Sequence, residues 1–294
     1  MYVVSLIASP GGLQPALVEN LRNAWGGAEA DWLSPDEAAE FTMEWVPDNR
    51  WNVWQSLQDE RVDMVVQGAE NRLKSMLLAD MDSTMIEQEC IDELAEEAGV
   101  GAHVRKITAR AMNGELDFEG ALIERVALMK GLDSAVIQRV LETRITHMPG
   151  ASVLLATMRA KGAYTVLVSG GFTEFTGVVA TALGFDENRA NTLIIEENIL
   201  SGEVQMPILG RQAKVTALEE ITKLRGLSEQ DVIAVGDGAN DLGMLHRAGT
   251  GVALHAKPSV AAECEVRINH GDLTALLYLQ GYARSDFVVP VPKG

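Results

Sequence analysis

Three short apolar runs, each ending in polar or glycine-rich residues, constrain the fold of this chain more than any other feature. They lie at residues 75–79, 164–168 and 232–235, and each has the length of a buried strand. Strands separated by helices predict a parallel sheet with helices on both faces, which binds ligands at the carboxyl ends of its strands. Segments with helical apolar spacing separate the runs, at 87–98, 150–161, 173–183, 212–224 and 241–248. We therefore expect an α/β fold with a doubly wound, mostly parallel sheet.

Two segments lie outside this pattern. Residues 87–147 separate the first two strands and are too long for one crossover helix, so they predict an inserted helical cap over the active site. Residues 1–72 contain all five tryptophans and alternate between strand and helix patterns, which predicts a small α+β domain. Residues 73–294 then form the second predicted domain. The short patterns in the first domain are strands at 2–8, 38–46 and 62–66 and helices at 13–25 and 51–57.

Charge and cysteine content exclude several classes of function. The formal net charge of the 294 residues is −18, which disfavours nucleic acid and anionic membranes as partners because both require a basic surface. A small anionic substrate is still possible, since a few buried cations or a metal can reverse the local potential. The two cysteines, Cys90 and Cys264, form no metal-binding or redox pair, and no segment predicts a signal peptide or a membrane span. We expect a cytoplasmic protein with reduced thiols.

Two carboxylates follow the first strand directly. Asp80 and Asp82 are two residues apart in the segment DMDST, so an extended backbone can direct both side chains to the same space. Paired carboxylates suit a hard cation such as Mg²⁺, and they also suit a nucleophile with a separate general acid/base. Asp, Ser and Thr are equally favoured as helix N-caps, so this motif alone does not decide between a site and a cap.

The second strand and a later helix add two groups that can bind phosphate. Ser169 and Gly170 follow the second strand, where a hydroxyl and backbone N–H groups form a cradle for phosphate oxygens. Lys214 lies near the start of the 212–224 helix, where its ammonium group can meet a phosphate. Each signal is weak alone, because strand-to-glycine turns and surface lysines are common.

The third strand runs into the segment GDGAND. Its glycines permit a tight turn, and Asp237 and Asp241 would then face the first pair of carboxylates, with Asn240 as an orienting amide. An Asp/Gly turn that caps a helix is an equally good explanation of this segment taken alone. The combination of these elements at successive strand ends is what favours a catalytic site.

The order DxDST, SGG, Lys and GDGxND resembles the haloacid-dehalogenase-like phosphotransferase superfamily over residues 75–272. Within it, the chain resembles the phosphoserine phosphatases, because Glu89 and Arg125 match residues that in that family contact the substrate's ammonium and carboxylate groups. Met112 and Phe118 match apolar cap positions that close over the substrate. Without the resemblance, Glu89 and Arg125 would be read as ordinary charges on exposed helices.

The resemblance implies a Mg²⁺-dependent phosphatase that hydrolyses O-phospho-L-serine to L-serine and phosphate, the last step of serine biosynthesis, through an aspartyl-phosphate intermediate. Asp80 would be the nucleophile and Asp82 the general acid/base. The Asp80 carboxylate, the Asp82 backbone carbonyl and Asp237 would hold the metal, with Asp241 in support. The remaining matched residues would hold the phosphate: Ser169, Gly170, Lys214 and Asn240.

Several alternatives stay open at this level. A related superfamily phosphatase could act on another small phosphomonoester, such as a sugar phosphate, a nucleotide or phosphohomoserine. A phosphomutase would share the carboxylate chemistry, a dehalogenase would need neither Asp82 as an acid nor a metal, and a catalytically idle regulator would not need the full acidic set. Residues 1–72 loosely resemble an ACT-type domain, so a regulatory role and a homodimer interface are both expectations for that segment.

Overall fold

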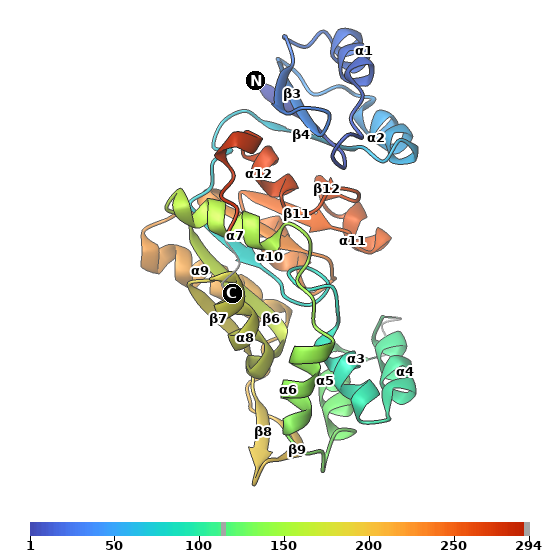
Figure 1. Cartoon of the computed structure of the whole chain (residues 1–294), viewed down its shortest axis with the longest axis vertical. Helices are drawn as coiled ribbons and strands as arrows, with labels where there is room; N and C mark the ends of the chain where they lie inside the picture. Colours follow the sequence, from blue (N-terminus) through green and yellow to red (C-terminus); the bar gives the residue numbers. More distant parts are fainter. Residues whose placement is uncertain (113–115, 291–294) are drawn as a thin grey trace. The chain divides into compact units, whose positions relative to one another are not determined.

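A computed structural model describes residues 1–112 and 116–290 of the chain (Figure 1). Its residues gather into two compact units. The first comprises residues 1–78, 149–165 and 218–294, and the second comprises residues 79–148 and 166–217. Among the described residues, no helix has the length and apolar content needed to cross a membrane.

An antiparallel four-stranded sheet forms the N-terminal part of the first unit. The sheet order is β2-β3-β1-β4, and all of its pairs are antiparallel. This βαββαβ connection is the ferredoxin-like arrangement, so the predicted small α+β domain is confirmed, whereas its boundary at residue 72 stays a prediction. The elements are β1 (Tyr2–Ile7), α1 (Pro15–Trp25), β2 (Asp31–Ser34), β3 (Ala38–Met43), α2 (Arg50–Asp59) and β4 (Asp63–Gly68).

Local sequence signals and burial explain this small domain. Helix α1 begins with Pro15, whose fixed φ suits a first helical position, and it ends at Gly26, which adopts the left-handed conformation with φ 68°. Val18 of α1 and Leu57 of α2 are buried in one apolar cluster with strand residues such as Phe41. The helices are therefore held on the sheet by apolar burial, which dominates the stability of such small layers.

The central sheet has the order β12-β11-β10-β5-β6-β7. The pairs β6–β7, β10–β11 and β11–β12 are parallel, as expected. The chain builds β6 and β7 on one side of β5 and β10 to β12 on the other, so the order reverses between β5 and β10. Ligands bind at such a reversal in open α/β sheets. The strands are β5 (Met76–Ala79), β6 (Tyr164–Phe172), β7 (Glu187–Asn191), β10 (Val232–Gly236), β11 (Thr250–Leu254) and β12 (Val266–Ile268).

Helices connect these strands close to their expected positions. The predicted segments at 150–161, 173–183, 212–224 and 241–248 are helical in the structure within a few residues, and two short helices follow them. Their bounds are α7 (Ala151–Ala160), α8 (Thr173–Leu183), α9 (Arg211–Arg225), α10 (Leu242–Arg247), α11 (Pro258–Ala262) and α12 (Ala275–Leu279).

The insertion after β5 is helical, as expected, and belongs to the second unit. It contains α3 (Cys90–Glu97), α4 (Gly101–Met112), α5 (Phe118–Ala127) and α6 (Ala135–Thr143).

A hairpin of β8 (Leu193–Glu196) and β9 (Ile199–Val204) was not foreseen from the sequence. Figure 1 shows it beside α5 and α6, and the backbone N–H of Gly131 donates to the Leu200 carbonyl at 2.9 Å. The hairpin therefore braces the loop between these two cap helices.

Candidate active site

Asp80 stands directly after the buried strand β5 and is 5% exposed. Its Oδ1 accepts a hydrogen bond from the Met81 backbone N–H at 2.8 Å, and the Lys214 ammonium lies 2.6 Å from the same oxygen. Lys214 is carried by α9 and is only 2% exposed. A cation buried this deeply requires an anionic partner, because an uncompensated charge in the interior is costly. The structure thus joins the predicted nucleophile to the predicted phosphate-binding lysine.

Asp82 lies in the turn that follows, where Ser83 has a φ of 53°. The Asp82 Oδ1 accepts from the Cys90 N–H at 3.0 Å, and its Oδ2 lies 3.5 Å from the Ser169 hydroxyl. Burial, together with the nearby Glu89 charge, raises the pKa of Asp82 to about 6, although the hydrogen bond from Cys90 and the charge of Lys214 act to lower it. A carboxyl group that holds a proton near neutral pH can act as a general acid. The direction of this shift agrees with the expected role.

The Ser-Gly-Gly segment at the end of β6 forms a close-packed turn. The Gly171 N–H donates to the Ser169 hydroxyl at 2.8 Å. A Cβ atom on Gly170 would stand 2.7 Å from the Phe118 ring of α5, and one on Gly171 would stand 2.9 Å from Asp82 Oδ2. A side chain at either position would therefore have to displace Phe118 or Asp82, and Phe118 of the cap lies against the predicted phosphate cradle.

The loop after β10 presents the second acidic group. The Gly238 N–H donates to Asp241 Oδ2 at 2.9 Å, and Asp241 is fully buried. Asp237 follows the strand and is 8% exposed. The half-buried Asn240 places its amide oxygen against Gly238, where no side chain would fit. The turn predicted from the glycines is confirmed, and its Gly238 N–H holds the Asp241 carboxylate.

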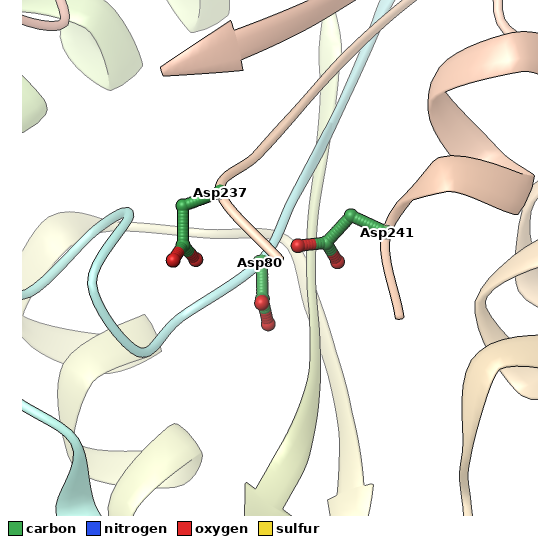
Figure 2. Close-up of side chains that lie close together, drawn as sticks. All are labelled: Asp80, Asp237 and Asp241. Carbon is green, nitrogen blue, oxygen red and sulfur yellow. The ribbon is translucent and has the colours of Figure 1, made fainter. Parts of the chain in front are cut away.

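The carboxylates of Asp80, Asp237 and Asp241 converge (Figure 2). One oxygen of each lies within 4.8 Å of the others. Asp80 and Asp237 are each the first residue after neighbouring strands of the central sheet, which explains why they meet. Three oxygen donors at this spacing suit a hard divalent cation such as Mg²⁺. The Asp82 carboxylate is not a member of this group, and the sequence interpretation assigned only its backbone carbonyl to the metal.

The two predicted head-group residues lie on cap helices. Glu89 is the N-cap of α3, and its Oε1 accepts from the Ser83 hydroxyl at 2.8 Å. Arg125 lies in the last turn of α5, and its Nε donates to the Ala121 carbonyl at 3.1 Å. Neither terminal guanidinium nitrogen makes a hydrogen bond to any residue of the described ranges. Met112 ends α4, and its side chain lies outside the described residues.

Two residues near this group were not singled out from the sequence. Cys90 holds Asp82 through its backbone N–H, and Asp92 has a buried Oδ1 that accepts no hydrogen bond from the described residues. A sequence signal for Asp92 exists in its spacing, because it lies three residues after Glu89 and so shares its helix face. The signal is weak alone, since acidic residues are common in the first turn of a helix.

Comparison with known proteins gives consistent results. A phosphoserine phosphatase of Streptomyces coelicolor is 41% identical over 226 residues, which cover 76% of this chain and 55% of that protein, so the chain spans little more than half of this relative. A haloacid dehalogenase family hydrolase of Salmonella enterica serovar Typhi has a similar structure, with a TM-score of 0.86, 29% identity, and coverage of 95% of this chain and 98% of that one. A structure described as a phospho-aspartyl intermediate analogue of phosphoserine phosphatase has a TM-score of 0.66 and 39% identity, and covers 70% of this chain and 98% of that one.

The family assignment rests on the segment that carries the site. The family model of haloacid dehalogenase-like hydrolases matches residues 77–246, more than half of the chain, and this range includes every predicted site residue from Asp80 to Asp241. The parallel sheet and the position of the acidic residues at its strand ends agree with the match. The chain belongs to the haloacid dehalogenase-like hydrolase family.

Proposed function

We propose that this protein hydrolyses O-phospho-L-serine to L-serine and phosphate, with Asp80 as the nucleophile. The observation that carries the proposal is the pairing of Asp80 with buried Lys214 at 2.6 Å, beside an Asp82 whose pKa is raised to about 6 by burial. Nucleophile, phosphate-binding cation and general acid then lie within one compact unit. The relatives described as phosphoserine phosphatases support the choice of substrate.

The cluster formed by Asp80, Asp237 and Asp241 is suited to bind the Mg²⁺ that the family uses. In this proposal the carboxylates of Asp80 and Asp237 and the backbone carbonyl of Asp82 hold the metal, and Asp241 supports them. Three convergent oxygen donors support the assignment, because Mg²⁺ prefers carboxylate, carbonyl and water oxygens. When bound, the metal offsets the repulsion between the anionic nucleophile and the anionic phosphate.

The chain's own residues supply the remaining steps. Asp80 attacks phosphorus while Lys214, the Ser169 hydroxyl and the Gly170 N–H hold the phosphoryl oxygens, with Asn240 as a further polar contact. Asp82 gives its proton to the departing serine oxygen and then accepts one from the water that hydrolyses the aspartyl-phosphate.

The cap residues account for the amino acid part of the substrate. The Arg125 guanidinium has two terminal nitrogens available for the substrate carboxylate, and Glu89 is an anionic partner for the ammonium group. Phe118 lies against Gly170 and would exclude water. Met112 is included in the proposal only because its position matches an apolar cap position of the family. A sugar phosphate offers no group that needs this pair of charges, which disfavours the alternative substrates.

The N-terminal domain is proposed as an ACT-like regulatory or dimerisation domain. Its ferredoxin-like order supports this, and strand β2 at the edge of its sheet pairs on one side only within the described residues. An edge strand can pair with a second chain. Sedimentation of the purified protein with and without L-serine would distinguish a dimer from a monomer and detect a ligand-linked change.

Phosphate release tests the function. We would compare L-phosphoserine, phosphothreonine, a sugar phosphate and p-nitrophenyl phosphate, each with Mg²⁺ or EDTA, using the wild-type protein and Asp80→Asn. The expected result is Mg²⁺-dependent release with a strong preference for phosphoserine, and its loss in Asp80→Asn with an unchanged circular dichroism spectrum. Release from the other compounds but not from phosphoserine would overturn the substrate, and an Asp80→Asn protein with normal turnover would overturn the nucleophile.

A further inference from the structure

Asn191 is a buried amide that the proposed mechanism does not use. It is the last residue of β7 and only 2% exposed, so each of its polar atoms needs a hydrogen-bond partner. Its Nδ2 donates to the Gly170 carbonyl at 2.8 Å and to the Leu209 carbonyl at 3.3 Å, and its Oδ1 accepts from the Leu209 N–H at 2.6 Å. One side chain thus joins the proposed phosphate cradle to the segment that leads into α9.

The register of β6 and β7 explains why the cradle needs this amide. Val168 is paired with Arg189 and Phe172 with Asn191, so the three cradle residues 169–171 lie opposite a single residue of the neighbouring strand. The cradle is therefore a bulge, in which the regular hydrogen bonds between the two strands are interrupted. A buried backbone carbonyl in such a bulge is costly unless another donor satisfies it, and the Asn191 side chain supplies that donor.

A chain of hydrogen bonds continues from this amide to the Ser169 hydroxyl. The peptide group between Gly170 and Gly171 is held at both ends, because its carbonyl accepts from Asn191 and its N–H donates to the hydroxyl oxygen at 2.8 Å. Since that N–H occupies an acceptor site of the hydroxyl, the hydroxyl proton must point elsewhere. Asp82 Oδ2 is 3.5 Å away, a long contact that leaves the proton available to a phosphoryl oxygen.

The other bonds of the amide hold the segment before the phosphate-binding lysine. They engage both the N–H and the carbonyl of Leu209, so the backbone of this residue is fixed at each of its polar groups. Helix α9 begins two residues later, at Arg211, and carries Lys214 near its start. Asn191 therefore connects the elements that present two of the proposed phosphate-binding groups.

We propose that Asn191 is a positioning residue that holds the Gly170 peptide group so that the Ser169 hydroxyl donates to the phosphoryl group. Asn191 acts through this peptide group and does not touch the substrate. The role rests on the proposed function, because that function gives Ser169 a phosphoryl oxygen to hold. It applies to any phosphomonoester, since all share the phosphoryl group. A donor that is already oriented stabilises the transition state without having to be rearranged during the reaction.

The same substitution at two positions of β7 separates this role from an effect of charge. Asn191→Asp keeps the side-chain shape and the acceptor for the Leu209 N–H, but in its ionised form it has no donor for the Gly170 carbonyl. Protonation at lower pH restores a donor, so activity lost relative to wild type should return as pH falls. Asn188→Asp is the control, because Asn188 lies on the same strand and its Oδ1 accepts from the Thr176 hydroxyl at 2.9 Å instead.

The assay measures kcat/KM for phosphoserine in Mg²⁺, divided by the wild-type value at each pH. We expect Asn191→Asp to lose about 30-fold at pH 8 and to recover to within about threefold of wild type at pH 5.5, as for the loss and return of one donor in the transition state. Over the same range Asn188→Asp should stay within about twofold of wild type. Circular dichroism checks the fold at each pH. If Asn191→Asp does not fold, Asn191→Ser adds no charge and should lose about tenfold at every pH.

A double-mutant cycle with Ser169→Ala separates positioning from a general loss of structure. In that background, either Asn191 variant should change kcat/KM at pH 8 by less than about twofold, because the hydroxyl to be positioned is gone. The role is overturned if the full loss persists in Ser169→Ala, or if both Asn191 variants match wild type at pH 8. If wild type hydrolyses another phosphomonoester but not phosphoserine, the proposed substrate fails, and the same cycle on that ester decides the role of Asn191. Wild type inactive on every ester would overturn both.

Discussion

Removal of the buried Asp63 carboxylate should strongly destabilise the protein. Asp63 begins β4 and is fully buried. Its Oδ1 accepts from the Asn269 N–H at 2.8 Å, and its Oδ2 accepts from the N–H groups of His270 at 3.0 Å and Gly271 at 2.7 Å. One side chain thus satisfies three successive backbone donors of the loop that follows β12.

The magnitude follows from those donors. Asp63→Ala leaves the buried N–H of Gly271 and the partly buried N–H groups of Asn269 and His270 without their acceptor, and each such group costs about 1–3 kcal/mol when it stays dry. Water can enter the space left by the carboxylate and satisfy some of them, so we expect a loss of about 3–5 kcal/mol in the free energy of unfolding. For a chain of this size that corresponds to a fall in Tm on the order of 10 °C.

Tryptophan fluorescence provides a selective assay, because all five tryptophans lie in residues 1–72. Urea unfolding followed by fluorescence reports on the N-terminal domain, and circular dichroism reports on the whole chain. Asp59→Ala is the control, since Asp59 ends α2 and is exposed. A fluorescence midpoint for Asp63→Ala equal to that of Asp59→Ala would refute the reasoning.

Two further perturbations test the site itself. Gly170→Ala places a Cβ 2.7 Å from the Phe118 ring, so phosphoserine turnover should fall about 100-fold, and Phe118→Leu in the same chain should recover about tenfold of it; no recovery would contradict the steric explanation. The pKa of Asp82 is about 6 in the folded protein and 3.8 for an ordinary exposed aspartate, so between these pH values the folded protein keeps a proton that the unfolded chain has lost. In EDTA, the wild-type free energy of unfolding should therefore fall by about 2 kcal/mol more than that of Asp82→Asn as pH rises from 4 to 6, and parallel urea-midpoint curves for the two proteins would contradict this.

The elements that position the chemistry could be predicted because their signals are local. Strands β5, β6 and β10 are short apolar runs that end where the glycines and aspartates begin, and α8 was expected with the same bounds that the structure has. The order of motifs then assigned Asp80 and Asp237 to strand ends. Their convergence follows from a general property of parallel sheets, in which neighbouring strands end at the same edge.

The parts that could not be predicted depend on contacts between distant segments. The β8–β9 hairpin has short strands with exposed residues such as Ile195, so its apolar pattern is weak, and it is held by bonds to the loop at Gly131 and Leu132. Asp63 looked like the interior of a predicted strand, and nothing local identifies residues 269–271 as its partners. Pairings across more than 200 residues have no signature in a single sequence.

Charge explains how a strongly acidic protein can receive an anionic substrate. The chain carries a formal charge of −18, yet the second unit buries Lys214 against Asp80 and Arg125 near Asp92. Burial raises the pKa of Asp82 to about 6, so this carboxyl group is protonated more often than an exposed aspartate is. Interactions between charges are stronger where water is excluded, so a buried cation acts on a nearby anion more strongly than distant, screened surface carboxylates do. In the proposed function, Lys214 and Arg125 would meet the two anionic ends of phosphoserine, and a metal held by the aspartates would offset their charge.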